Sequence, residues 1–126
     1  RRVIAADTSS LSAFLAGEPG ADTDLLADAM RGNALVLPPA VLTELLSDPK
    51  APPAMARKLC ELTCLEITDG YWSRAGESRA KLRSRGLKAN VGDTLIAQSC
   101  IDHDLPLITR DEDFRHFAKH CGLRLA

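Results

Sequence analysis

Short apolar runs alternate with longer segments of mixed polarity along the whole chain. Each run is only three or four residues long. Short, mainly apolar runs of this kind are typical of strands that are buried within a sheet. We therefore predict strands over residues 3–6, 35–37, 65–67, 105–108 and 123–125.

The segments between these runs have the spacing and the end signals of helices. In residues 22–31, Leu25, Leu26 and Ala29 fall on one side of a helix, and Gly32 follows as a stop signal. Proline pairs at 38–39 and 52–53 suit the first turn of a helix. The pattern predicts helices over residues 9–16, 22–31, 38–47, 53–64, 69–87, 92–103 and 111–120.

This alternation favours an α/β fold, a three-layer α/β/α sandwich around a short-stranded, mainly parallel sheet. Strands that are joined by helices run parallel, and the helices then cover both faces of the sheet. A length of 126 residues suits one domain, which we expect to span residues 1–126. In such folds, ligands bind beyond the carboxyl ends of the strands, where the strand order reverses.

Acidic residues stand at the places where this fold binds its ligands. Asp7 directly follows the first predicted strand, and Asp111 follows the strand over 105–108, with Asp113 two residues later. Asp93 heads the apolar side of its helix, and Glu44 lies at the edge of an apolar stripe. A carboxylate in such a position is unfavourable unless it is paired or binds a metal ion.

Each acid also has an ordinary structural interpretation. Asp7, Asp93 and Asp111 could cap the helices that follow them, because aspartate is a preferred N-cap residue. Glu44 could be a surface acid, and Asp113 a first-turn acid that favours the helix dipole. Together, however, the acids would repel one another at the sheet edge unless a cation lay between them. Oxygen ligands favour Mg²⁺ or Mn²⁺ over zinc, and such ions promote phosphodiester hydrolysis.

Composition adds few constraints to this interpretation. The formal net charge is −1, so any signal for nucleic-acid binding must be local. No apolar run approaches the ~18–20 residues of a membrane span, and residues 1–4 do not begin a signal peptide. We therefore expect a cytoplasmic protein with no membrane partner.

The cysteines raise a different metal hypothesis. Cys60 and Cys64 are four residues apart, as are His116 and His120, so two helices could present a Cys2His2 zinc site. The spacing is not that of a zinc finger, and the cysteines sit among apolar neighbours. Small buried thiols are the preferred interpretation.

The acidic motifs resemble those of a known family. Val3-Ile4-Ala5-Ala6-Asp7-Thr8-Ser9 is similar to the first strand of PIN domains, and Val91-Gly92-Asp93-Thr94-Leu95-Ile96-Ala97 to their Asp-opened helix. Residues 107–114, with Thr109, Asp111 and Asp113, resemble the family's Thr-x-Asp-x-Asp-Phe segment. Glu44 lies in the helix after the second strand, as it does in the family. The order and spacing of these motifs resemble a PIN-domain ribonuclease across nearly the whole chain.

The short form, with Leu45-Leu46-Ser47-Asp48-Pro49 after the glutamate, most resembles VapC toxins of VapBC toxin–antitoxin pairs. The resemblance implies catalytic, metal-binding roles for Asp7, Glu44, Asp93 and Asp111. It implies supporting roles for the hydroxyls of Thr8, Ser9 and Thr109, and for Asp113. It further implies Mg²⁺ or Mn²⁺ as cofactor, an RNA substrate of the tRNA or rRNA class, a VapB-like antitoxin and a homodimer. The expected activity is endoribonucleolytic cleavage that inhibits translation.

Local charge gives some independent support for RNA. Residues 74–88 carry six cations and one acid, and Arg85 and Lys88 at the end of this run could contact phosphates, as could Arg110. A solvated helix face, or an ion pair in the case of Arg110, would also explain them. Tyr71 and Trp72 could stack on bases, although packing is the simpler explanation.

Three other functions compete with the ribonuclease toxin. A catalytically silent PIN-fold module could bind RNA or a partner without cleaving, although a silent module has no reason to keep four acids. A nuclease directed at DNA would have the same metal site, and the sequence does not separate it from a ribonuclease. A phosphotransfer receiver would need paired acids after the first strand, where Ala5 and Ala6 stand.

Overall fold

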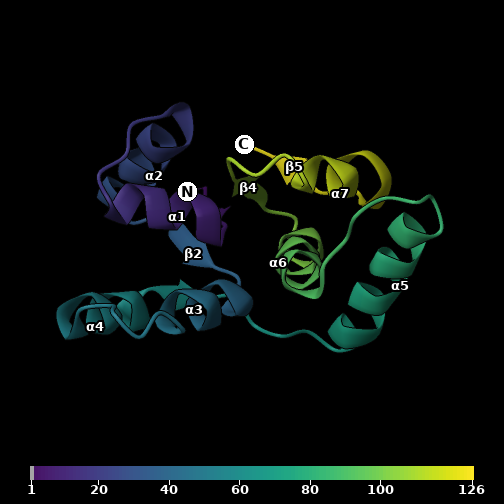
Figure 1. Cartoon of the computed structure of the whole chain (residues 1–126), viewed down its shortest axis with the longest axis horizontal. Helices are drawn as coiled ribbons and strands as arrows, with labels where there is room; N and C mark the ends of the chain where they lie inside the picture. Colours follow the sequence, from purple (N-terminus) through teal and green to yellow (C-terminus); the bar gives the residue numbers. More distant parts are fainter. Residues whose placement is uncertain (1) are drawn as a thin grey trace.

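Strands and helices alternate through the computed structural model, which describes residues 2–126 (Figure 1). Their order confirms the alternation predicted from the apolar runs. The elements are β1 (Ile4–Ala6), α1 (Thr8–Leu15), α2 (Ala21–Arg31), β2 (Leu35–Leu37), α3 (Pro39–Leu46), α4 (Pro53–Glu61), β3 (Thr63–Cys64), α5 (Tyr71–Arg83), α6 (Val91–Asp102), β4 (Pro106–Ile108), α7 (Phe114–Cys121) and β5 (Arg124–Leu125).

The strands form one sheet in the order β3-β2-β1-β4-β5, and every neighbouring pair is parallel. Ala5 of β1 is aligned with Val36 on one side and with Leu107 on the other, so β1 is the central strand. The chain builds β2 and β3 on one side of β1 and then crosses to build β4 and β5 on the other. The strand order therefore reverses beside β1, which is where this class of fold binds its ligands.

Helices on both faces of the sheet complete the α/β/α arrangement and confirm the predicted fold class. The core contains few aromatic residues, and Phe114 and Phe117 of α7 are the largest of its fully buried side chains. Aliphatic residues fill the rest, with Leu37, Ile96 and Leu107 at 1% exposure or less. Within the described part of the chain, no helix is both long and apolar enough to cross a membrane.

The third strand lies two residues earlier than predicted. It spans Thr63–Cys64 and is aligned with Val36 and Leu37 of β2, whereas the apolar run at residues 65–67 continues into a loop. The preceding helix accordingly ends at Glu61, because Leu62 already has an extended backbone (ψ 144°). Pairing with β2 decides the position of this strand. Residues 63–64 and 65–67 have similar polarity, so the sequence does not show which of the two stretches pairs.

Helix α5 is also shorter than predicted. It begins at Tyr71, after Gly70 in the left-handed region (φ 81°), and ends at Arg83, before a turn that contains Gly86 (φ 71°). Residues with positive φ interrupt a right-handed helix, and glycine adopts this conformation without strain. Both ends of the predicted range 69–87 are therefore turns, and only its middle part is helical.

Candidate metal centre

Two neighbouring parallel strands bring Asp7 and Asp111 together. Asp7 follows β1, and its backbone N–H donates to the carbonyl of Ile108, the last residue of β4, at 3.0 Å. The Thr109 hydroxyl donates to Asp7 Oδ2 at 2.6 Å and accepts from the backbone N–H of Asp111 at 3.0 Å. One hydroxyl thus connects the segments that follow the two central strands.

Asp7 is both a helix cap and a buried acid. Its Oδ1 accepts from the backbone N–H of Ser10 at 2.9 Å, which caps α1, while Oδ2 also accepts from the Ser9 hydroxyl at 2.7 Å. The residue is only 2% exposed. Burial raises the pKa of Asp7 despite the hydrogen bonds that favour its charged form, and the charge of Asp111 raises it further. The capping and metal-binding interpretations are therefore compatible at this residue.

A second group of acids surrounds the start of α6. Oxygen atoms of Asp93, Asp111 and Asp113 all lie within 4.8 Å of one another. The backbone N–H of Asp113 donates to Asp111 Oδ1 at 2.9 Å, which holds these two residues in one turn. The N-cap of α6 is Asn90, which accepts from the Asp93 N–H at 2.7 Å. Asp93 is therefore not the cap of its helix, and its carboxylate is left for the acidic group.

Charge repulsion accompanies this grouping. Burial raises the pKa of Asp93 to about 6, and the charges of Asp111, Asp113 and Glu44 contribute, whereas the hydrogen bond from Asn90 opposes the shift. A carboxyl group with a pKa near 6 is close to half protonated in mildly acidic solution. A bound cation would offset the repulsion between the carboxylates that adds to the effect of burial on this pKa.

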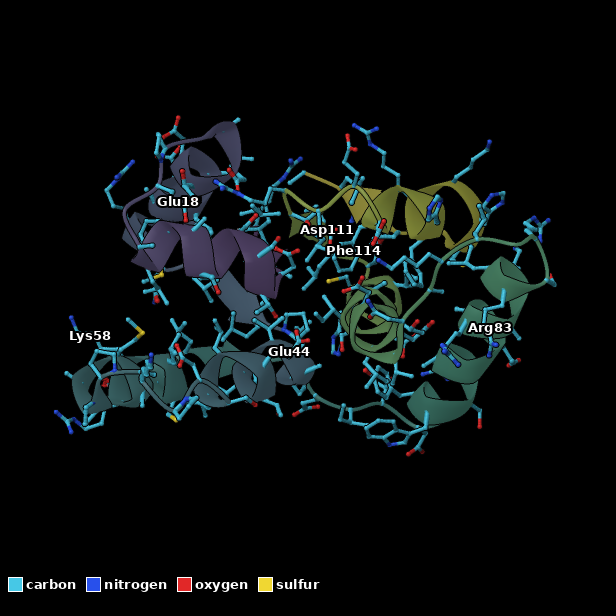
Figure 2. All side chains as sticks on the ribbon, viewed as in Figure 1. Glu18, Glu44, Lys58, Arg83, Asp111 and Phe114 are labelled. Atoms are coloured by element: carbon cyan, nitrogen blue, oxygen red, sulfur yellow. The ribbon has the colours of Figure 1, made fainter. Side chains whose placement is uncertain are left out.

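Glu44 of α3 lies outside the group of three acids but approaches the start of α6. It is exposed, it accepts a short hydrogen bond from the Thr8 hydroxyl, and its Oε2 lies 3.0 Å from where a Cβ on Gly92 would stand. Figure 2 shows Glu44 and Asp111 approaching α6 from different sides. A Cβ at position 92 would make this contact tight and would shift the Glu44 carboxylate by a few tenths of an ångström, so the glycine favours the close approach.

The donor set fits a hard divalent cation. The acids Asp7, Glu44, Asp93, Asp111 and Asp113 offer only carboxylate oxygens. Mg²⁺ and Mn²⁺ prefer oxygen ligands, whereas zinc favours sulfur and nitrogen in most structural sites. The structure brings Asp113, which the sequence suggested only as a supporting acid, directly into the group with Asp93 and Asp111.

The candidate RNA-binding cations differ in their surroundings. Arg110 turns away from the acids: its guanidinium donates to both oxygens of Asp22 at 2.7 and 3.0 Å and lies 3.4 Å from Glu18. The hydrogen bond from Arg110 lowers the pKa of Asp22 to about 2. The ion-pair interpretation therefore describes Arg110, with Asp22 of α2 as its partner. In contrast, Lys88 Nζ reaches Asp113 Oδ2 at 3.3 Å.

The two aromatic residues considered for base stacking also differ in their surroundings. Tyr71 is buried, and its hydroxyl donates to the carbonyl of Leu95 at 2.7 Å, so it packs α5 against α6. Trp72 is 64% exposed and contacts Tyr71 edge-on. With Ile67 and Val91, it lines a groove that extends to Glu44.

The zinc hypothesis is wrong for this chain. Among residues 2–126, Asp93, Asp111 and Asp113 are the only His, Cys, Asp or Glu residues that gather in a group of three or more. Cys60 lies on α4 and Cys64 on β3. His116 and His120 belong to α7, at the opposite end of the molecule (Figure 1). All four cysteines are free thiols, but the expectation of small buried thiols holds only for Cys100 and is wrong for Cys60, which is exposed at the solvent side of α4.

Sequence reasoning missed three residues that shape the site. Asn90 caps the helix that carries Asp93, Gly92 leaves room for Glu44, and Asp22 holds Arg110 away from the acids. Asn90 had a readable signal, because asparagine three residues before a helical acid is a common cap. Gly92 and Asp22 act through residues distant in sequence, so no local pattern marks them.

Comparison with known proteins places this site in a family. The sequence model described as "PIN domain" matches residues 4–120. A comparison with curated proteins found no significant match.

Two solved structures have the same fold. VapBC2 from Rickettsia felis, described as bound to a DNA fragment from the promoter, superposes with a TM-score of 0.73 at 20% identity and covers 98% of this chain and 97% of its own. VapBC-5 from Mycobacterium tuberculosis, described as a member of a family of toxin-antitoxin systems, has a TM-score of 0.69 at 19% identity and covers 99% and 98%. At this identity the structures establish the fold, and the sequence model, which covers most of the chain, establishes the family: this chain belongs to the PIN domain family.

Proposed function

We propose that this chain is a divalent-metal-dependent endoribonuclease and the toxin of a VapBC-type pair. The observation that carries the proposal is the group of acids at the reversal of strand order, where Asp93, Asp111 and Asp113 lie within 4.8 Å. Membership of the PIN domain family supports a nuclease, and the fold shared with two VapBC structures supports the toxin assignment. The cytoplasmic location expected from the sequence stays a prediction.

In this proposal Asp7, Glu44, Asp93 and Asp111 hold one or two Mg²⁺ or Mn²⁺ ions, and Asp113 assists. Such ions, when bound, neutralise charge on a phosphodiester and supply an activated water. The hydroxyls of Thr109 and Ser9 fix the orientation of Asp7, and that of Thr8 fixes Glu44. Glu44 is the most exposed of the four, so it is the acid placed to accept a proton from the attacking water.

RNA is the proposed substrate, and inhibition of translation is the proposed consequence of cutting tRNA or rRNA. The acids recognise phosphates and not the sugar, so they would act equally on DNA. Cleavage of matched RNA and DNA strands of one sequence distinguishes the two nucleases. Preference for RNA supports the toxin assignment, whereas equal or faster cleavage of DNA contradicts it.

Removal of the metal ion gives the direct test of the enzyme. Purified, partner-free protein with Mg²⁺ or Mn²⁺ should cut total cellular RNA into discrete fragments, and EDTA should abolish the fragments. Mapping the fragment ends by sequencing would identify the target. Folded protein that binds RNA but produces no fragments with either ion would favour the catalytically silent binding module.

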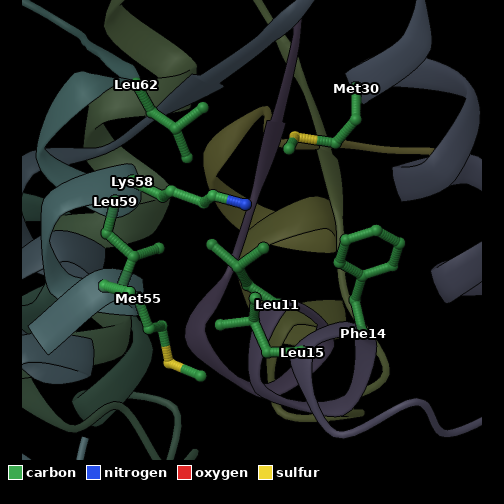
Figure 3. Close-up of a pocket in the computed structure, with 9 residues that line it drawn as sticks. Leu11, Phe14, Leu15, Met30, Met55, Lys58, Leu59 and Leu62 are labelled. Carbon is green, nitrogen blue, oxygen red and sulfur yellow. The ribbon is translucent and has the colours of Figure 1, made fainter. Parts of the chain in front are cut away.

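The antitoxin is the second part of the proposal, and the surface carries a groove that suits it. Side chains of α1, α2 and α4 line a groove of about 310 Å³ (Figure 3), including Leu11, Phe14, Leu15, Met30, Met55 and Leu59. Exposed apolar grooves of this kind mark sites where a partner packs an apolar helix face or strand. Leu15, Met55 and Leu59 also line the neighbouring pocket beside Thr8 and Glu44. A partner in the groove would therefore lie next to the metal centre.

A double variant tests this surface. Leu15→Glu with Met30→Glu places charges on two groove residues that are 38% and 43% exposed, so the fold should survive. Loss of two central apolar contacts should weaken binding of the VapB-like protein from the neighbouring gene by at least about thirtyfold in calorimetry. Leu25→Glu, at a 40% exposed position of α2 outside the groove, is the matched control. Equal binding by the double variant and the control would place the antitoxin elsewhere.

The homodimer expected from the resemblance stays a prediction.

A further inference from the structure

Helices α5 and α7 gather cations on one surface. The two helices pack together where the Cys121 thiol approaches the carbonyl of Ser78 at 3.9 Å. Around this contact, α7 and the C-terminal end of α5 with the turn after it present one set of basic residues, which we call the α5–α7 cationic surface: Lys81, Arg85, His116, Lys119 and His120. Figure 1 shows the two helices approaching each other near their ends, away from α4.

Electrostatic interactions connect the members of this surface. Loss of hydration lowers the pKa of His120, and the positive charges of Arg85, Lys119, Lys81 and His116 lower it further. The positive charges of these residues repel one another, and an anionic ligand would reduce that repulsion.

Three cations of this surface are also unpaired, whereas five of the ten arginines in the described part of the chain form ion pairs. Arg74, Arg110 and Arg124 each form ion pairs, with Asp102, Asp22 and Asp104 respectively. Among the described residues, Lys81, Arg85 and Lys119 form no ion pair, and all three are exposed. Their charges are available to a ligand from solution.

The surface continues directly from the metal centre. Helix α7 begins at Phe114, immediately after Asp113, which belongs to the acidic group. Lys88 lies three residues beyond Arg85 and pairs with Asp113 at 3.3 Å, so it connects the cations to the acids. From there α7 extends over about 12 Å, as follows from a rise of about 1.5 Å for each residue. This length accommodates more than one phosphate of a nucleic-acid strand.

We propose that the α5–α7 cationic surface binds the phosphate backbone of RNA on one side of the scissile bond. A substrate would then need to extend from the metal centre along α7 for full affinity. The inference rests on the proposed nuclease function and adds where the substrate lies. Contacts to phosphates position a strand and do not read its bases, so the requirement concerns the length of the RNA and not its sequence.

A nucleic acid suits this surface better than an acidic protein does. Protein interfaces contain an apolar core, commonly with an aromatic anchor. The exposed large apolar residues of the described chain, such as Leu15, Met30 and Trp72, all lie outside the α5–α7 cationic surface. Charge without an apolar core is typical of phosphate-backbone recognition.

The test measures RNA binding by a variant with three neutralised cations, Lys81→Gln, Arg85→Gln and Lys119→Gln. Both it and its reference carry Asp7→Asn, so that RNA is not cut during fluorescence anisotropy with Mg²⁺ present. A labelled RNA hairpin with a long stem should bind at least about tenfold more weakly to the variant, and the slope of log K against log salt should fall by about 2–3. A labelled oligonucleotide of four nucleotides should show less than a twofold difference.

A matched control carries Arg2→Gln, Lys50→Gln and Arg57→Gln, which remove the same charge from the segment before β1, the loop after α3, and α4. These residues are also exposed, and this control should bind the hairpin as the reference does. Equal weakening by both triple variants would overturn the inference, because net charge alone would then explain binding. No weakening by either variant would overturn it as well. Weak binding of both RNAs only by the first variant would contradict the dependence on length.

The outcome for this surface is separable from that for the nuclease. If the wild-type chain cleaves RNA with Mg²⁺ and the three neutralising substitutions leave hairpin binding unchanged, and leave cleavage unchanged when Asp7 is restored, the inference fails while the nuclease stands. If the hairpin binds through the surface but no ion supports cleavage, the proposed function fails while the binding surface stands.

Discussion

Replacing Asp7 by asparagine is expected to reduce metal-dependent cleavage of RNA by more than about a hundredfold. Loss of a residue that only supports a metal ligand costs up to about that factor, and Asp7 is proposed as a ligand itself. The structure predicts that the variant still folds, because the side chain keeps its size and Oδ1 can still accept from the backbone N–H of Ser10. The hydroxyls of Ser9 and Thr109 can rotate to accept from the new amide.

Stability measurements distinguish loss of the metal site from misfolding. Burial raises the pKa of Asp7, so its ionised form destabilises the native state above the unfolded pKa, and asparagine removes that penalty. Without metal, the melting temperature of the variant should equal or exceed that of the wild type at pH 7. With Mn²⁺, the wild type should gain more thermal stability than the variant does.

Asp28→Asn is the matched control, since Asp28 is exposed and pairs only with Arg31 one turn away. It should retain full cleavage and the full stabilisation by Mn²⁺. Metal-dependent cleavage by the Asp7→Asn protein at the wild-type rate would remove Asp7 from the site and weaken the whole ligand assignment.

Affinity for Mn²⁺ is expected to fall about tenfold for each pH unit below 6. Asp93 has a pKa of about 6, so a proton and a cation compete for its carboxylate in mildly acidic solution. At pH 5 only about one tenth of this group is ionised, whereas at pH 7 most of it is. Isothermal titration calorimetry at pH 5, 6 and 7 measures the trend directly and also reports proton release on binding at pH 6.

The metal-free protein should show the opposite pH dependence. The folded pKa of Asp93 is raised, so the native state holds a proton that the unfolded state has lost between about pH 4 and pH 6. The contribution of this group to stability is therefore greatest below pH 4 and falls as the pH rises through 6. Saturating Mn²⁺ at pH 7 should restore the stability.

The calorimetric titrations contain the contradicting outcome: an affinity for Mn²⁺ that stays constant between pH 5 and pH 7 would show that Asp93 does not bind the ion.

The sequence alone predicted the α/β architecture and the acidic residues of the candidate metal centre. Short apolar runs separated by helical segments leave a parallel sheet as the arrangement that buries them, because the helices return the chain in the same direction. Asp7 and Asp111 could be identified because each follows such a run directly, and the carboxyl ends of parallel strands share one edge. Glu44 and Asp93 could be identified by their places at apolar helix stripes, but a single acid in a helix has several ordinary explanations, and the family resemblance added the reason to prefer a metal site.

The tertiary structure decided which side chains share the site, because that depends on contacts between segments distant in sequence. The position of β3 depends on its pairing with β2, and the place of Glu44 depends on the missing side chain of Gly92. Arg110 stands next to Asp111 in the chain but turns to Asp22, whereas Lys88 reaches Asp113 from 25 positions away. Local sequence sets the period of each element, whereas packing between elements sets the position of β3 and decides which charges meet.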